Sequence, residues 1–219
     1  MKKWIAVFMA CMMMVSVLAG CGGDQSEQYG PYVQSLLDVS YKKDASVYLE
    51  LVDDTQENVD GYYEDTMLYW AYEVADAFYM VLINEEVEAR MVTLMENVFS
   101  HAKYEVADAV KAGDYYTVEV TIHPINFTDL VYDEVAVYAE DFQLRSEAGE
   151  YGDYENDDAA YEAWEVAYAN GVLDILESYL DQLDYAEPVS KIVKVTVDED
   201  DLYGISEEDQ YDLESYLIY

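Results

Sequence analysis

The sequence predicts an α+β fold with N-terminal helices, a small antiparallel sheet and a short C-terminal helix. Three observations support this fold class. Long stretches repeat apolar residues every three to four positions, which is typical of amphipathic helices. Three shorter stretches alternate apolar and polar residues, which is typical of strands with one covered face. A glycine-containing turn joins the first two of these strands, as in a hairpin.

The first half of the folded region is predicted to be helical. Residues 29–40 and 44–52 show helical spacing of apolar side chains, and a long helix follows N-cap candidates at 53–55. Glu57 lies three residues after Asp54, which is the capping-box spacing. The apolar stripes are Tyr63, Met67, Trp70, Val74, Phe78 and Val81 and then, after the N-cap candidate Asn84, Val87, Met91, Leu94, Val98 and Phe99.

The sheet is predicted to contain three strands. Residues 103–110 and 115–123 form a hairpin, with Gly113 in the turn at a position that suits positive φ. After Pro188, alternation returns over residues 189–198, and we expect this third strand to pair with the hairpin. In the second strand, Tyr116, Val118, Val120 and Ile122 point one way, and Thr117, Glu119, Thr121 and His123 point the other.

A long helical excursion, 127–183, separates the second and third strands. It consists of a helix over 127–147, an acidic loop at 149–158 and a helix that starts at Asn156 or Asp157. The stripe of this last helix is Tyr161, Trp164, Tyr168, Val172, Ile175, Tyr179 and Leu183. Ser206 with Asp209 starts the short final helix. The sequence therefore predicts a leader (1–20), a tether (21–28) and a single acidic α+β domain (29–219).

The leader indicates export. Lys2 and Lys3 precede the apolar run Trp4–Leu18, which is too short for a comfortable membrane span. The run ends in Leu18, Ala19, Gly20 and Cys21, and this segment resembles the bacterial lipobox at all four positions. The alternative is an ordinary signal peptide with a chance cysteine. The polar, glycine-containing tether that follows at once favours the lipobox.

The lipobox resemblance implies acyl chains on the sulfur of Cys21, which would anchor the protein to the extracellular face of the cell membrane. Two or three acyl chains hold a protein on a bilayer durably. Cys11 is lost with the leader and Cys21 is consumed by lipid, so the mature domain has no thiol. Disulfides, thiolate nucleophiles and cysteine metal sites are therefore excluded.

The charge of the chain excludes one class of partner. The ten Lys and Arg residues include Lys2 and Lys3, so the mature chain has eight basic and 48 acidic side chains and a formal charge of −40. Such a polyanion repels nucleic acid and the anionic surface of its own bilayer. The acidity fits a solubility device, a salty habitat or a cationic partner. The 24 tyrosines fit half-buried core edges or a platform for sugars or peptides.

No arrangement of residues indicates catalysis, a cofactor or a metal. The histidines of the mature chain are His101, expected to close a helix, and His123, expected to be solvated or to cap a strand end. Their spacing matches no zinc motif. The acidic loops 152–158 and 198–201 carry oxygen ligands that would suit calcium, but neither matches an EF-hand. Motifs for serine nucleophiles and phosphate-binding loops are absent from the sequence.

The order of segments resembles a group of uncharacterised lipoproteins of clostridia-like Gram-positive bacteria that carry a domain of unknown function. The resemblance starts at the lipobox and covers nearly the whole mature chain. It is carried by the stretch 36–44, the stretch 48–52, the capped acidic helix and the hairpin at 103–106 and 115–124. It implies a curved sheet covered by helices, similar to cystatin-like or nuclear-transport-factor-like folds. The long excursion at 127–183 departs from a compact member of such folds.

The sequence therefore predicts a non-enzymatic surface lipoprotein whose domain binds an envelope protein, peptide or glycan, or another extracellular ligand. One alternative is an envelope-associated enzyme that uses a carboxylate, a tyrosine and His123 in a sheet pocket. Another is a purely structural or immunity-type role. An enzyme requires a deep pocket with a desolvated carboxylate, whereas a binding module requires a contiguous exposed surface of tyrosine and aliphatic residues.

Overall fold

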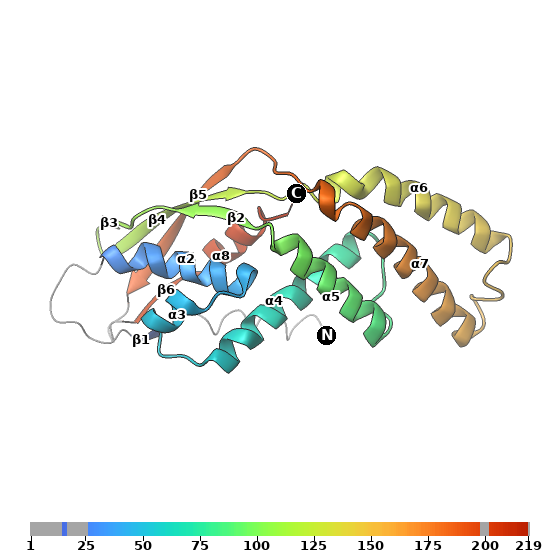
Figure 1. Ribbon diagram of the computed structural model, residues 1–219, viewed down its shortest axis with the longest axis horizontal. Coiled ribbons are helices and arrows are strands. Elements are labelled where there is room, and N and C mark those ends of the chain that lie inside the picture. Colours follow the sequence, from blue (N-terminus) through green and yellow to red (C-terminus); the bar gives the residue numbers. More distant parts are fainter. Residues whose placement is uncertain (1–14, 17–25, 198–201, 219) are drawn as a thin grey trace. The chain divides into compact units, whose positions relative to one another are not determined.

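The α+β fold is confirmed by a computed structural model, which describes residues 15–16, 26–197 and 202–218 (Figure 1). N-terminal helices, a small curved antiparallel sheet and a short C-terminal helix all form as predicted. The chain divides into two compact units, each made of separate segments. Of the described residues, the first unit contains 15–16, 26–66, 102–124, 185–197 and 202–218, and the second contains 67–101 and 125–184.

The first unit contains the sheet. Its strands are β1 (Val15–Ser16), β2 (Lys103–Val106), β3 (Val110–Ala112), β4 (Tyr115–His123), β5 (Val189–Val197) and β6 (Leu202–Ile205). The hydrogen-bonded order is β1-β6-β5-β4-β2, with β3 also paired to β4, and every pairing is antiparallel. The predicted third strand, β5, pairs with β4 over eight residue pairs and so confirms the expected sheet.

One face of the sheet is covered by helices. Val118, Val120 and Ile122 of β4 are fully buried, as the alternating pattern predicts. Helix α2 (Ser26–Lys42) packs against β2 and β4, and its Tyr29 ring lies 4.5 Å from that of Tyr116. Two further helices of this unit, α3 and α8, pack against α2 and β5, respectively. Their bounds are α3 (Ser46–Leu51) and α8 (Glu207–Glu214).

The sheet differs from the prediction in its details. The stretch 103–110 forms two short strands. The amide of Ala107 still donates to the carbonyl of Glu119 on β4, and regular pairing then stops until Val110. The sequence also gave no indication of β6, whose four residues are too few to show alternation and which pairs with β5 through backbone groups. The hairpin turn is as expected, since Gly113 has a φ of +79°.

The second unit consists of helices. They are the C-terminal part of α4 (Gln56–Ala77), α5 (Glu85–Phe99), α6 (Thr128–Glu147), α7 (Asp158–Ser178) and the 3-10 turn η2 (Leu180–Gln182). Helix α7 packs against both α5 and α6, so the predicted excursion is a helical hairpin of α6 and α7 (Figure 1). Within the parts of the chain that the structure describes, none of the helices is long and apolar enough to cross a membrane.

Local signals placed most helix starts correctly. The side chains of Asn84, Asp157 and Ser206 accept hydrogen bonds from backbone amides at the starts of α5, α7 and α8. At the start of α4 the cap is Thr55, whose hydroxyl accepts a hydrogen bond of 3.2 Å from the backbone amide of Asn58. The expected capping box of Asp54 and Glu57 therefore does not cap this helix. Helix α2 begins at Ser26, so the last three residues of the predicted tether are helical.

Candidate functional site

The predicted lipidation site lies outside the described residues. The structure does not describe the four lipobox residues, Leu18, Ala19, Gly20 and Cys21. The acidic loop 198–201 also lies outside the described residues. The acyl anchor on Cys21 therefore remains a prediction from sequence.

The two histidines lie in different units. His101 follows α5, where its Nδ1 lies 3.1 Å from the carbonyl oxygen of Asn97, in agreement with its predicted position at a helix end. His123 is less exposed than expected, since only 15% of its side chain is accessible. Its Nε2 lies 3.7 Å from a carboxylate oxygen of Glu105, and its ring packs edge-on against Tyr185. Packing against Tyr185 contributes to this partial burial.

Polar groups of the acidic loop 152–158 form hydrogen bonds within the loop and at the start of α7. Asp153 accepts a hydrogen bond of 2.8 Å from the Asn156 amide group, and Asp157 accepts from the amides of Ala159 and Ala160 at the start of α7. Among the described residues, no three histidine, cysteine or carboxylate side chains gather in a way that would hold a metal ion.

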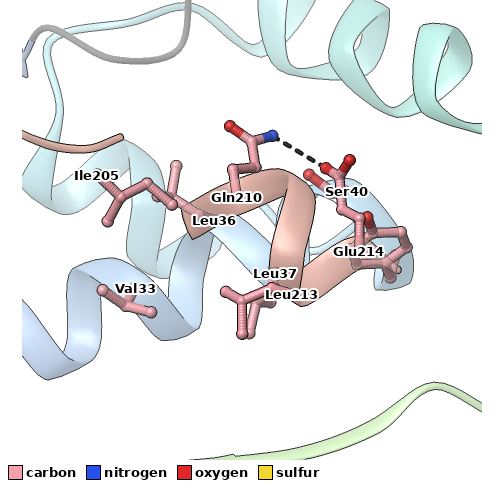
Figure 2. Close-up of a pocket in the computed structure, with 9 residues that line it drawn as sticks. Val33, Leu36, Leu37, Ser40, Ile205, Gln210, Leu213 and Glu214 are labelled. Carbon is pink, nitrogen blue, oxygen red and sulfur yellow. Dashed lines mark hydrogen bonds between the residues drawn. The ribbon is translucent and has the colours of Figure 1, made fainter. Parts of the chain in front are cut away.

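A small cavity lies within the first unit between α2, β6 and α8 (Figure 2). Its volume is about 20 Å³, which is room for one water molecule. The wall is mostly apolar, and polar groups gather at one end, where the Gln210 amide donates a hydrogen bond of 3.0 Å to Glu214. The lining residues are Val33, Leu36, Leu37, Ser40, Tyr41, Ile205, Gln210, Leu213 and Glu214.

Glu214 is the desolvated carboxylate of this cavity. Its residue is only 7% exposed, and burial raises the pKa of its carboxyl group above the ordinary value, opposed by hydrogen bonds from Gln210 and Tyr41. The predicted enzyme site combined a carboxylate, a tyrosine and His123. The cavity contains the first two types of group, but His123 is not among its lining residues.

The second unit contains a continuous group of seven aromatic side chains on the α6–α7 hairpin. We call this group the aromatic array, and it consists of Tyr138, Phe142, Tyr151, Tyr154, Tyr161, Trp164 and Tyr168. Phe142 and Tyr168 are buried and form its base. Tyr138, Tyr151 and Trp164 pack on these two rings. The array is thus held in place by the core of the hairpin.

Trp164 lies at the centre of the array. Its ring stacks on that of Tyr154 at a centroid distance of 5.0 Å and an interplanar angle of 4°. It also stacks on Tyr168 at 6.4 Å and on Tyr161 at 6.1 Å. The indole nitrogen donates a hydrogen bond of 2.8 Å to the hydroxyl of Ser146 on α6. Stacking and this hydrogen bond fix the orientation of the indole ring.

The outer members of the array reach the surface within an acidic stretch of the chain. Tyr161 is 44% exposed, and Tyr154 and Trp164 are half-buried. Residues 140–165 contain ten acidic side chains, and Arg145 is the single basic one. Preorganised aromatic rings beside carboxylates can bind cations, sugars or peptides. The arrangement therefore has the features expected of a binding surface.

The sequence indicated the array only in part. Tyr161, Trp164 and Tyr168 were predicted as one core stripe, but the structure buries Tyr168 and leaves Tyr161 exposed. Tyr151 and Tyr154 were not predicted to take part, because they lie in the acidic loop outside any periodic segment. Two tyrosines spaced three residues apart in an otherwise polar loop were the signal that could have revealed them.

Comparison with known proteins supports the fold. No protein-family model matches the chain, and no curated protein sequence is significantly similar. The structure is similar to that of the candidate lipoprotein ycdA of Bacillus subtilis, with a TM-score of 0.58 and 12% sequence identity. The similar region covers 90% of this chain and 57% of ycdA, so the chain spans little more than half of that protein.

At this identity the likeness shows a shared fold alone. The chain thus has a fold that also occurs in a candidate lipoprotein. This supports the predicted resemblance to lipoproteins in general terms. The specific likeness to clostridia-like lipoproteins, and to cystatin-like or nuclear-transport-factor-like folds, stays a prediction.

Proposed function

We propose that this chain is a lipid-anchored protein of the outer cell surface that binds an extracellular or envelope ligand without catalysing a reaction. The acyl chains on Cys21 attach it to the membrane, and the folded region extends from that anchor. The lipobox sequence and the fold shared with ycdA support the location. No cofactor is needed for this function.

The observation that supports binding is the aromatic array. Its rings are oriented by a buried base, and its outer members lie in an acidic stretch of the chain. Tyr161 is 44% exposed and donates a hydrogen bond to Glu165, and Tyr154 is half-buried. Rigid tyrosine and tryptophan side chains supply large contact areas at a low cost in conformational entropy. Such residues are enriched among those that dominate binding energy at interfaces.

Lipidation is tested by expressing the full precursor in a Gram-positive host supplied with radioactive palmitate. We expect the protein to carry label and to sediment with membranes, and Cys21→Ser to lose both properties. Cys11→Ser is the matched control and should be labelled like the wild type. Membrane sedimentation of unlabelled Cys21→Ser would contradict the proposed anchor.

Binding is tested with the lipidated full-length protein, purified in detergent, against envelopes isolated from cells that lack it. We expect saturable binding that weakens about tenfold in a Tyr154→Ala/Tyr161→Ala double variant. Tyr211→Ala, which alters an exposed tyrosine of α8 in the first unit, should bind like the wild type. Saturable binding that is equal in all three proteins would exclude the array as the binding surface.

A second candidate function is catalysis by an envelope enzyme, and Glu214 is the observation that favours it. A carboxyl group whose pKa is raised by burial, next to Tyr41, has the character of a general acid. The cavity of about 20 Å³ is far smaller than the sites that bind most substrates. For this reason we rank binding above catalysis. Hydrolysis of envelope polymers that Glu214→Gln abolishes would reverse this order.

A further inference from the structure

A strained and exposed tyrosine follows α4 in the second unit. Tyr79 has a φ of +56°, in the left-handed region that side chains other than glycine rarely adopt. The amide of Met80 donates a hydrogen bond of 2.8 Å to the carbonyl of Ala75, which closes the helix end. Glycine is strongly preferred at this position of a helix end because it adopts positive φ without strain. The tyrosine therefore makes the fold less stable than glycine would.

The ring of Tyr79 does not recover this cost by packing, since the residue is 87% exposed. It belongs to a run of six apolar residues, Phe78–Ile83, that connects α4 with α5. Phe78 and Met80 are buried and hold the connection in place, whereas Val81 is 45% exposed. We call the segment Phe78–Ile83 the apolar loop. Its outward side chains, those of Tyr79 and Val81, form an apolar surface that faces solvent.

The apolar loop is connected to the aromatic array. The hydroxyl of Tyr168, a buried member of the array, donates a hydrogen bond of 3.0 Å to the carbonyl of Phe78. Both segments lie in the second unit. The hydrogen bond therefore holds the backbone of the loop at Phe78 against the buried base of the array.

Charge limits what can occupy this surface. Residues 72–88 carry five carboxylates, at Glu73, Asp76, Glu85, Glu86 and Glu88, and no lysine or arginine. A second copy of this chain would bring the same negative charge, and bilayers and nucleic acids are anionic as well. Tyrosine rings and carboxylates together favour lysine and arginine with apolar neighbours.

We propose that the apolar loop, with Tyr79 as its central contact, docks a basic segment of a partner protein that presents lysine or arginine beside apolar side chains. This proposal rests on the proposed function and adds the class of ligand and the main contact residue. The apolar side chains of the partner segment cover the Tyr79 ring and Val81. Its lysine or arginine side chains pair with the carboxylates of residues 72–88.

The test uses the lipidated full-length protein in detergent and a short amphipathic peptide of lysine and leucine. We expect Tyr79→Gly to weaken binding about tenfold while its Tm stays equal to or above that of the wild type. A loss of binding without a loss of stability separates a contact residue from a structural one. Lys43→Gly is the matched control, because Lys43 also has a positive φ, of 54°, but lies in the first unit.

Two further peptides separate the contributions of charge and apolar contact. A lysine–serine peptide should bind much more weakly than the lysine–leucine peptide, and a glutamate–leucine peptide should not bind. Equal binding of the lysine–leucine peptide by wild type and Tyr79→Gly would overturn the proposal, and so would equal binding of the lysine–serine peptide. If Tyr79→Gly binds normally while the Tyr154→Ala/Tyr161→Ala variant does not, the proposed function stands and this inference fails.

Discussion

The hydroxyl of Tyr168 donates a buried hydrogen bond to the backbone carbonyl of Phe78 and so ties α7 to the apolar loop. The oxygen–oxygen distance is 3.0 Å. Removing the hydroxyl would leave a carbonyl that is shielded from water without this partner. Such losses destabilise proteins by about 1–3 kcal/mol.

Tyr168→Phe should therefore lower the free energy of unfolding by that amount, because the ring and its stacking on Trp164 are kept while the hydrogen bond is lost. Urea unfolding followed by circular dichroism measures the change. Tyr132→Phe is the matched control, since Tyr132 is 61% exposed on α6. Equal unfolding of the two variants would show that the Tyr168 hydroxyl contributes nothing to stability.

Gly171 of α7 is predicted to tolerate no side chain. A Cβ atom at this position would lie 1.9 Å from the Tyr138 hydroxyl oxygen and 2.1 Å from the adjacent ring carbon. Gly171→Ala should destabilise the protein by about 1–3 kcal/mol, the usual cost of overpacking, although alanine is the better helix former. Thermal unfolding measures this change.

A double-mutant cycle separates the clash from the helix propensity. In a Tyr138→Ala background the obstructing ring is gone, so Gly171→Ala should stabilise the protein by about 1 kcal/mol. The change of sign between the two backgrounds is the decisive result. Destabilisation in both would mean that the Tyr138 ring is not what excludes a side chain.

Arg90 joins α5 to α7 through its planar guanidinium group. Its Nε and Nη2 atoms each donate a hydrogen bond of 2.7 Å to the carboxylate of Glu177. Nη2 also donates a hydrogen bond of 2.6 Å to the carboxylate of Asp174. The side chain is 28% exposed, so water weakens these ion pairs only partly. Lysine keeps the charge but cannot form the paired contact with Glu177.

Arg90→Lys should therefore cost about 1–2 kcal/mol of stability, with a smaller cost at high salt. Chemical denaturation at low and high sodium chloride gives both quantities. Arg145→Lys, on α6, is the control, since the ion pairs of Arg145 are local and exposed. A similar cost for both variants would argue against a special role for the Arg90 contacts.

Glu214 predicts a pH-dependent stability. Burial raises the pKa of its carboxyl group above the ordinary 4.5, so the folded state binds this proton more tightly than the unfolded state. The contribution of the protonated Glu214 side chain to the free energy of unfolding is fully present below pH 4.5. It is lost as the pH rises through the raised pKa of the folded state. Glu214→Gln keeps a neutral side chain at every pH and avoids this loss.

Glu214→Gln and the wild type should therefore have similar stability near pH 4, and the variant should be more stable at neutral pH. Each 1 kcal/mol of this difference corresponds to about 2–4 °C in Tm for a chain of this size. Thermal unfolding across this pH range is the measurement. Glu208→Gln corrects for the removal of one negative charge, because Glu208 is exposed. A gain that is equal for both variants at all pH values would refute the prediction.

The sequence could predict those elements whose signals are local. The alternation in β4 and the caps at Asn84, Asp157 and Ser206 depend on residues within one or two turns, and all are confirmed. Strand β6 depends instead on backbone pairing with β5, which leaves little trace in four residues. The cavity also brings together groups from opposite ends of the chain, Tyr41 and Glu214, which no local pattern connects.

The candidate binding surface was harder to predict for the same reason. The tyrosine-rich composition was evident, but which rings are buried depends on how α6 packs against α7. Tyr168 and Tyr161 lie on the same predicted stripe, yet one is buried and the other is open to solvent. The positive φ of Tyr79 has no counterpart in the sequence, because tyrosine is an unusual residue at such a helix end.

The pairing of β1 with β6 has a consequence for maturation. In β1, Val15 pairs with Tyr203 and Ser16 pairs with Leu202. Cleavage before Cys21 would remove β1. Processing would then expose the outer backbone groups of β6 and create a sheet edge that the precursor does not have. Those groups would exchange hydrogen with solvent faster in the processed protein, so release of the leader would be recorded in the backbone amide of β6 that faces β1, far along the chain from the cleavage site.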